Sequence, residues 1–241
     1  MGDGVSAWPW KLGELALSFG TTAAVVLNEE DEAFLSKSRP GLPVTRLSYG
    51  LGVDTSLFPR ERFDVSGRNE LLRLLWVGEF IDRKRPFDAL EVVETLIQQG
   101  KNVELTMCGE GPLIDVLRSE VYRRGLSASV LAPGRVPVLD YYRGSDMLIH
   151  TARWEGLPRV FLEALSVGVP VFSYPIKGAT GLMGVNTSQG ETPSLLAAAI
   201  ESSIDQGQIS DIPTVAELSS RAAGDALVAF IDELLQAQQG I

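Results

Sequence analysis

The 241-residue sequence contains a single cysteine, Cys108, and a single histidine, His150. One cysteine permits no internal disulfide, so nothing indicates an oxidising compartment, and we expect a cytoplasmic protein. Basic residues are also in the minority, because 21 Lys and Arg stand against 31 Asp and Glu, for a net charge of −10. Non-specific binding of nucleic acid depends on a basic surface, so nucleic acid is not an expected partner.

Long hydrophobic runs are absent as well. No apolar run reaches the roughly 18 residues of a membrane span, and the best candidate, residues 15–28, contains Ser and Thr. The basic-then-apolar order of a signal peptide is missing at the start of the sequence. Peripheral contact with a membrane through Trp8 and Trp10 stays an alternative, although the plainer interpretation is that the two indoles pack within the protein.

The remaining composition, 45% apolar and 22% charged, is that of a globular chain. From residue 71 onward, short apolar runs alternate with helical patterns, and two later runs, Met147–His150 and Pro170–Tyr174, flank a helix near Arg159–Val167. Near-continuous apolar strands are typical of sheets that are covered on both faces. The sequence therefore predicts an α/β fold with a doubly wound parallel sheet. We expect the amphipathic segments Pro193–Asp205 and Val215–Leu235 to pack on its flank.

The first 66 residues differ from the rest. Their pattern predicts a short helix (Lys11–Phe19), a strand (Thr22–Leu27), a second helix (Glu29–Ser36) and a turn-rich stretch. So small a unit rarely buries a core of its own. We therefore divide the chain into residues 1–66, which must lean on the main domain or on a missing partner, and residues 67–241, the main domain.

Two glutamates mark a candidate site in RWEGLPRVFLEALSVGVPV, residues 153–171. Pro158 is expected at the first helical position, where the nearby amides lack helical acceptors and favour an anion such as phosphate. Glu163 then lies about 7 Å further along the axis, at 1.5 Å per residue, within reach of ribose hydroxyls. The alternative is that Glu155 is a helix cap and Glu163 a solvated helix acid.

Three segments, the last of which contains these residues, carry a family resemblance. The segments WVGEFIDRKRP (76–86), MCGEGPL (107–113) and GRVPVLDYYRGSDMLIHTARWEGLPRVFLEALSVGVPV (134–171) follow one another in the chain. In that order they resemble the retaining, nucleotide-sugar-dependent glycosyltransferases of group 1, which have two facing Rossmann-like domains. The resemblance implies that residues 67–241 form the Rossmann-like donor-binding domain, and that residues 1–66 are a remnant of the acceptor domain with its linker.

The same resemblance assigns roles to residues. Glu155 matches the acid beside the transferred sugar and Lys84 the cation that clamps the diphosphate, and these two are the predicted catalytic residues. Glu163 matches the acid that holds the ribose. Glu79 stands where the family usually has an arginine, and either Arg83 or Arg85 supplies that charge or both are solvated loop residues. The other predicted substrate-binding residues are Gly156, Leu157, Pro158, Arg159 and Arg135.

The implied activity is transfer of a hexosyl group, with retention, from a nucleoside diphosphate sugar to an acceptor hydroxyl, without a metal or another cofactor. The acceptor, a glycan or a lipid, would sit on a missing N-terminal domain or a partner chain. The main alternative is a non-catalytic module that binds a nucleotide or a partner, which Glu79 favours, and a third possibility is an epimerase of nucleotide sugars. A nicotinamide cofactor is not expected, since Ile114 replaces the third glycine of that fingerprint.

Two other groups have ordinary structural interpretations. The acids of residues 29–32 suit the first turn of a helix better than a metal site. His150 ends a predicted strand near Glu155, where it is either a buried, hydrogen-bonded side chain or a general base.

Overall fold

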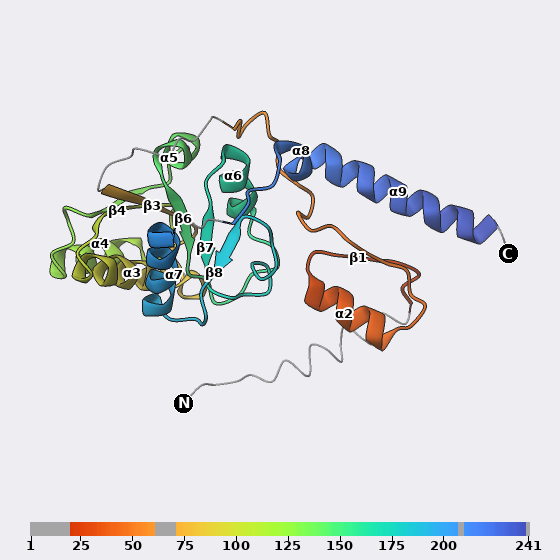
Figure 1. Cartoon of the computed structure of the whole chain (residues 1–241), viewed down its shortest axis with the longest axis horizontal. Coiled ribbons are helices and arrows are strands. Elements are labelled where there is room, and N and C mark those ends of the chain that lie inside the picture. The colour runs from red at the N-terminus through yellow and green to blue at the C-terminus, as the bar shows by residue number, and fades with distance from the viewer. Residues whose placement is uncertain (1–19, 61–70, 207–209, 240–241) are drawn as a thin grey trace.

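The computed structural model describes residues 20–60, 71–206 and 210–239 (Figure 1). The predicted helix at 11–19, both N-terminal indoles, Trp8 and Trp10, and the domain boundary at residue 66 lie outside them. The strands are β1 (Ala24–Val26), β2 (Val44–Arg46), β3 (Leu71–Val77), β4 (Asn102–Cys108), β5 (Val130–Gly134), β6 (Met147–His150), β7 (Val171–Ser173) and β8 (Val185–Thr187). The helices are α2 (Glu29–Ser38), the 3-10 turn η1 (Asp82–Lys84), α3 (Pro86–Gln98), α4 (Ile114–Arg123), α5 (Leu139–Gly144), α6 (Arg159–Val167), α7 (Pro193–Gln206), α8 (Val215–Leu218) and α9 (Ser220–Gln239).

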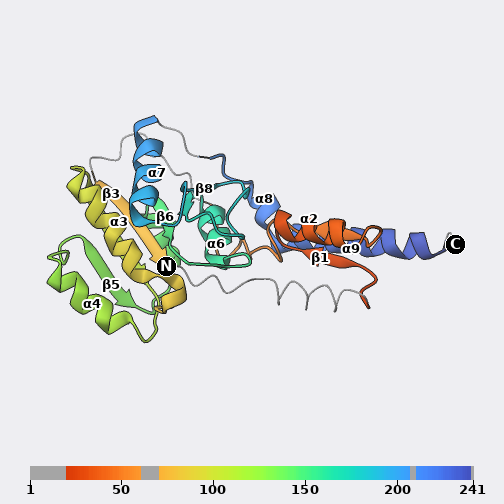
Figure 2. The ribbon, with the colours of Figure 1, turned by 90° about the horizontal axis from the view of Figure 1, so that it is seen from below.

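Six parallel strands form the central sheet, in the order β5-β4-β3-β6-β7-β8. Helices α3, α4 and α7 cover one face, and α5 and α6 cover the other (Figures 1 and 2). The predicted doubly wound parallel sheet is therefore confirmed. The strand order reverses between β3 and β6, and in such sheets the carboxyl ends of the two strands at the reversal border the binding crevice.

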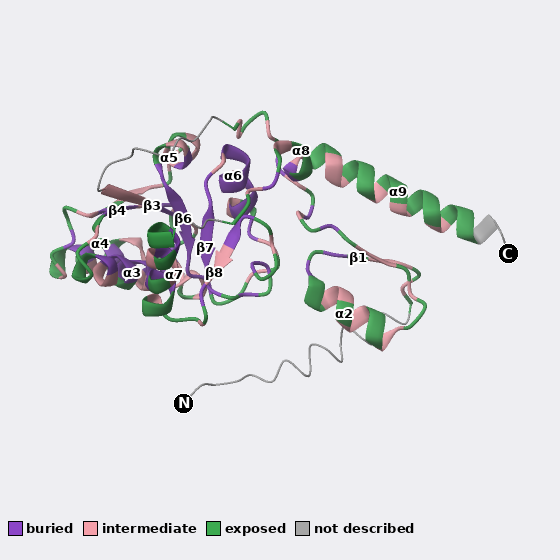
Figure 3. Ribbon diagram, in the orientation of Figure 1, coloured by how far each residue is buried: buried purple, intermediate pink, exposed green. Residues whose placement is uncertain are grey.

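The core forms because the inner strands are apolar on both faces. Leu74, Leu75 and Trp76 of β3 are at most 1% exposed, and every residue of β6 is buried (Figure 3). Local signals agree with this packing. Pro86 is the first residue of α3, and glycines with positive φ, Gly100 and Gly125, follow the ends of α3 and α4, as their sequence predicts.

Several short elements were not predicted from the sequence. They are β2, β5, α5 and β8, none longer than six residues. Strand β5 has the sequence VLAPG, in which Pro133 and Gly134 suggest a turn. Residues 130–134 form a strand because they pair with β4, and a local sequence pattern does not reveal this pairing.

At the N-terminal side, β1, α2 and β2 form a separate parallel pair with a crossover helix. Asn28 caps α2 through its side chain, and the four acids that follow occupy the first turn, where they complement the helix dipole. Arg46 pairs with Glu32 at 3.2 Å. These contacts favour the structural interpretation of the acidic run over a metal site. The ion pair between Asp31 and Lys177 joins this unit to the main domain.

Of the two predicted tail helices, only the first packs on the sheet along its length. Helix α7 packs against α3, β7 and β8, as expected. The second segment breaks at Ser219 into α8 and α9, and α9 extends away from the sheet (Figure 1). The expectation that it packs on the flank of the sheet is thus wrong for α9, which leaves Val228, Ile231 and Leu235 exposed. Among the described residues, no helix combines the length and apolar character needed to cross a membrane.

The linker after the β1–α2–β2 unit is fastened to the tail of the chain. The amide of Val53 donates to the carbonyl of Leu218, and the amide of Ser220 donates back to Val53, both at 2.9–3.0 Å. Gly52 allows this approach, since a Cβ there would lie 2.6 Å from backbone atoms of Ser219. Further along, the Arg60 guanidinium donates to the carbonyls of Leu165, Ser166 and Pro213, which tie the linker to the end of α6.

Candidate functional site

The candidate site lies where the sheet order reverses, in the loops that follow β3 and β6. The loop after β3 lies against the loop after β4, because the amide of Phe80 donates to the carbonyl of Glu110. Glycine is required at this contact. Gly109 has a φ of 143°, and a Cβ on it would lie 1.8 Å from the carbonyl oxygen of Gly78.

An ion-pair cluster joins these two loops. Glu155, after β6, accepts from both Lys84 and Arg83, the latter at 2.6 Å, through the same carboxylate oxygen. The side chains of Lys84 and Glu155 are each 15% exposed, and that of Arg83 is 30% exposed. Arg83 also donates to the carbonyl of Trp154 and lies over its indole ring at 4.7 Å. The structure therefore brings three of the predicted site residues into direct contact.

Buried hydrogen bonds fix the backbone below Lys84. The hydroxyl of Thr151, at the end of β6, lies 3.0 Å from the carbonyl of Lys84 and 2.9 Å from that of Arg85. The indole N–H of Trp76 donates to the same hydroxyl at 3.1 Å. Arg85 has a φ of 50°, the only positive value among the described residues other than glycine. This backbone conformation is unfavourable for a residue other than glycine. The surrounding contacts must therefore impose it on the turn that presents Lys84.

Arg85 itself belongs to a different group. Its guanidinium pairs with Asp88 at 2.9 Å and lies over the Tyr174 ring at 4.9 Å, while Tyr174 donates to Asp88 at 2.7 Å. Burial, followed by the bond to Asp88, raises the pKa of Tyr174. Of the two arginines proposed to replace the family's cation, Arg83 is the one that lies beside Lys84 and Glu155.

Helix α6 spans Arg159–Val167, as predicted, but Pro158 precedes its first residue. Pro158 is the N-cap, with φ −68° and ψ 122°, and Arg159 is the first helical residue, so the expected first helical position of Pro158 is wrong. Pro158 is buried, whereas Gly156 and Arg159 are exposed and Leu157 is half-buried. A positive helix end without a side-chain cap or first-turn acid favours an anion.

A neighbouring loop lies closely over this helix start. A Cβ on Gly178 would lie 2.3 Å from the carbonyl oxygen of Gly156. This contact requires glycine and fixes the loop after β7 against the segment that leads into α6. The loop after β7 is therefore a direct neighbour of the segment to which the sequence assigns anion binding.

Glu163 occupies the second turn of α6 and has a partner of its own. The phenol of Tyr142, in α5, donates to its Oε2 at 3.0 Å. Tyr142 is fully buried, and Glu163 is half-buried at the edge of the core. Burial, followed by the negative charge of Glu163, raises the pKa of Tyr142 well above its usual value, so the phenol stays protonated as a donor.

Two predicted substrate-binding residues lie at the periphery. Glu79 is exposed directly after β3. Arg135, after β5, pairs with Glu110 at 2.8 Å, and both side chains are mostly exposed. Since β5 is two strands away from β3 in the sheet, Arg135 is not part of the Lys84–Glu155 cluster.

His150 lies below the cluster and is 2% exposed. Its Nδ1 is 3.5 Å from the hydroxyl of Ser173, its ring contacts Phe161 edge-on at 4.9 Å, and its Nε2 has no partner among the described residues. Burial, followed by the charges of Lys84 and Arg83, lowers the pKa of His150 to about 3. A neutral, enclosed imidazole favours the structural interpretation over a general base.

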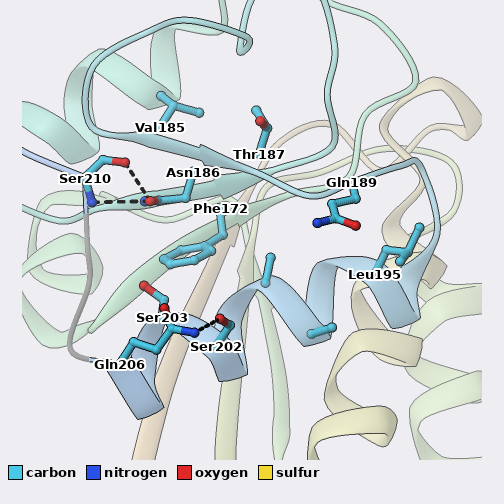
Figure 4. Close-up of a pocket in the computed structure, with 12 residues that line it drawn as sticks. Phe172, Val185, Asn186, Thr187, Gln189, Leu195, Ser202, Ser203, Gln206 and Ser210 are labelled. Atoms are coloured by element: carbon cyan, nitrogen blue, oxygen red, sulfur yellow. Dashed lines mark hydrogen bonds between the residues drawn. The ribbon is translucent and has the colours of Figure 1, made fainter.

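Neither metal ligands nor a cavity elsewhere in the described fold marks a different site. No three His, Cys, Asp or Glu side chains gather into a possible metal site within the described parts of the chain. A cavity of about 630 Å³ lies between α7 and the edge strand β8 (Figure 4). Its lining is uncharged, with Asn186 and Gln206 already bonded to Ser210 and Ser202. It includes none of the predicted site residues.

Comparison with known proteins agrees with this geometry. The sequence model of the family described as "Glycosyl transferases group 1" matches residues 58–206, more than half of the chain. The amylovoran biosynthesis glycosyltransferase AmsK of Erwinia amylovora is 30% identical over 67% of this chain and 43% of its own length. A putative teichuronic acid biosynthesis glycosyltransferase of Bacillus subtilis, TuaC, is 29% identical over 46% of this chain and 26% of its own. The chain thus spans less than half the length of these relatives.

Solved structures show the same fold at low identity. The Anabaena protein HepE in complex with UDP superposes with a TM-score of 0.69 and 17% identity, covering 100% of this chain and 70% of its own. The pneumococcal O-GlcNAc transferase GtfA, in complex with UDP and GlcNAc, has a TM-score of 0.66 and 12% identity, covering 92% of this chain and 47% of its own.

Proposed function

The chain belongs to the glycosyl transferases group 1 family, and on that premise we propose that it is the donor-binding half of a retaining glycosyltransferase. It would move a hexosyl group from a nucleoside diphosphate sugar to an acceptor hydroxyl. The observation that carries the proposal is the contact of Lys84, Arg83 and Glu155 between the loops after β3 and β6. These loops border the crevice where sheets of this type bind nucleotides.

The clustered residues and those of α6 have chemical roles in this proposal. Lys84 and Arg83 would neutralise the negative charge that develops on the departing diphosphate, as preorganised cations do in a partly buried site. The start of α6 would hold a phosphate through its free amides. Glu155 would lie beside the transferred sugar, and Glu163 would accept hydrogen bonds from the ribose. No metal or cofactor is required by this scheme.

Two comparisons support a nucleoside diphosphate as the ligand. HepE and GtfA were crystallised with UDP, and GtfA also with GlcNAc. For this chain we propose a nucleoside diphosphate, without specifying the base. We propose that the acceptor, a glycan or a lipid, binds outside the donor-binding domain, either on an acceptor domain or on a partner chain.

The first test is binding. Isothermal titration calorimetry of the full chain with UDP, GDP and ADP, each with and without a chelator, should give heat with at least one of them and no dependence on the chelator. The absence of heat with all three contradicts the proposal.

The second test is activity. Enclosure between two domains orients the acceptor and can supply on the order of 7–11 kcal/mol of a barrier. We therefore expect no measurable transfer of radiolabelled sugar by this chain alone, and transfer when a polypeptide carrying an acceptor domain is added. Robust transfer by the 241 residues alone would contradict the assignment of residues 1–66 to a remnant.

The exposed acid at Glu79 favours a second candidate, a module that binds a nucleotide without turnover. In that case nucleotide binding persists, while every added acceptor domain fails to restore transfer. If the wild-type chain fails in this way, Glu79→Arg tests the cause. Transfer by this variant under the same conditions would show that the missing cation prevents catalysis.

A further inference from the structure

Tyr142 is the only side chain in the described structure that is shown bonded to the carboxylate of Glu163. Its hydroxyl donates to Oε2 at 3.0 Å, and the tyrosine is fully buried while the acid reaches partial exposure. A buried phenol needs an acceptor, and the carboxylate oxygen is the nearer of two, since the carbonyl of Val160 lies 3.5 Å from the same hydroxyl. The other oxygen, Oε1, is not used by this bond.

The ring of Tyr142 has an aromatic neighbour. Phe58, in the linker, contacts it edge-on with the ring centroids 6.1 Å apart. The backbone of Phe58 is in turn held, because the buried hydroxyl of Ser166 donates to its carbonyl at 2.7 Å. The phenol oxygen therefore has a defined position relative to α6, which carries both Ser166 and Glu163.

A carboxylate that accepts from two vicinal hydroxyls must hold its plane in one orientation. A carboxylate has about four acceptor positions, so one phenol leaves enough of them for a diol. A glutamate on a helix surface otherwise samples several rotamers, and fixing them costs free energy at each binding event. A donor that is already in place removes part of that cost.

We propose that Tyr142 is a positioning residue, which holds the carboxylate of Glu163 in the orientation that accepts the two ribose hydroxyls of the donor nucleotide. The inference rests on the proposed function, because it requires a nucleotide at this site. It also explains how the site would discriminate between sugars: the preference for ribose over deoxyribose would depend on a tyrosine that does not contact the ligand.

The test compares nucleotides that differ by one hydroxyl. Calorimetry with UDP, 2′-deoxy-UDP and inorganic pyrophosphate, with the GDP and ADP pairs in parallel, is applied to the wild-type chain, Tyr142→Phe, Glu163→Gln and the double variant. Tyr141→Phe is the matched control, since it removes a phenol from the same helix. Circular dichroism and thermal melting establish that each variant folds.

We expect Tyr142→Phe to weaken UDP roughly fivefold, the usual effect of one hydrogen bond, and to leave pyrophosphate unchanged. The ratio of the UDP and 2′-deoxy-UDP affinities should fall toward one. The double variant should be no weaker than Glu163→Gln, and Tyr141→Phe should match the wild type.

Two results overturn the inference while preserving the proposed function. One is a ribose preference that survives Tyr142→Phe, and the other is an equal loss of UDP and pyrophosphate, which indicates a general effect on the fold. A wild-type chain that binds none of the nucleotides overturns the proposed function as well.

Discussion

Lys84 and Glu155 form an ion pair in which each side chain is only 15% exposed. Arg83 contacts the same carboxylate oxygen. The cations that we assign to the diphosphate are therefore neutralised in part by an acid. In the proposed complex a diphosphate would compete with Glu155 for these cations, so binding strength and catalytic geometry would oppose each other at this acid.

The first prediction follows from that competition. Glu155→Gln should tighten binding of the nucleoside diphosphate roughly tenfold, because removing one charged hydrogen-bond partner frees Lys84 and Arg83 for the phosphates. Sugar transfer in the presence of an acceptor domain should fall at the same time. Calorimetry and radiolabel transfer measure the two effects. Glu191→Gln, which removes a partner of Arg85, is the control, and weaker binding by Glu155→Gln contradicts the prediction.

The second prediction concerns acid stability. The folded-state pKa of His150 is about 3, against about 6.5 when unfolded. Between these values the unfolded state binds the extra proton, so the stability that the neutral imidazole confers is fully present above pH 6.5 and is lost as the pH falls toward 3. A single proton changes the free energy of unfolding by about 1.4 kcal/mol per pH unit.

His150→Gln removes this titration, and no second histidine exists to replace it. We expect the loss of stability between pH 7 and pH 5 to be about 2 kcal/mol smaller in the variant than in the wild type. Urea denaturation at the two pH values measures the difference. Equal losses in both proteins would show that the imidazole is not enclosed in its neutral form.

The third prediction concerns the linker. Arg60 donates to carbonyls of Leu165 and Pro213 at 2.7 and 2.6 Å, but the residue is exposed. Arg60→Ala should therefore lower the free energy of unfolding by about 1 kcal/mol. Arg60→Lys should recover only part of it, since a lysine cannot reach several carbonyls with a planar fork. An unchanged denaturation midpoint for the alanine variant would rule out this anchoring role.

The fourth prediction compares two glycines with positive φ. Gly109→Ala places a Cβ 1.8 Å from the carbonyl oxygen of Gly78, whereas Gly100→Ala meets nothing within 4 Å. We expect Gly100→Ala to cost about 1 kcal/mol from backbone strain alone. Gly109→Ala should prevent the loops after β3 and β4 from packing. Thermal melting monitored by circular dichroism compares the two variants. Equal melting temperatures would be inconsistent with the contact between Gly109 and Gly78.

Local patterns were sufficient for the long elements. The seven-residue strands β3 and β4 and the helix α3, which begins at Pro86, were predicted because each carries its signal within its own residues. The three-residue strands β2 and β8 were not, since pairing with β1 and β7, not propensity, makes them strands. The exposed course of α9 also escaped prediction, because an apolar stripe does not specify what it packs against.

The site divides along the same line. Lys84, Arg83 and Glu155 were identified from their segments, and the structure brings them together, while their roles stay predictions. Tyr142 was not singled out, although a tyrosine needs a polar partner when it is buried. Thr151 had no signal at all, because its partners in the turn after β3 are distant in sequence.

The backbone pairing of Val53 with the residues around Ser219 has a mechanical consequence. The linker from the β1–α2–β2 unit and the segment that leads into α9 are bonded side by side at this point. The linker therefore cannot move away from the start of α9 at Val53 without breaking both backbone hydrogen bonds.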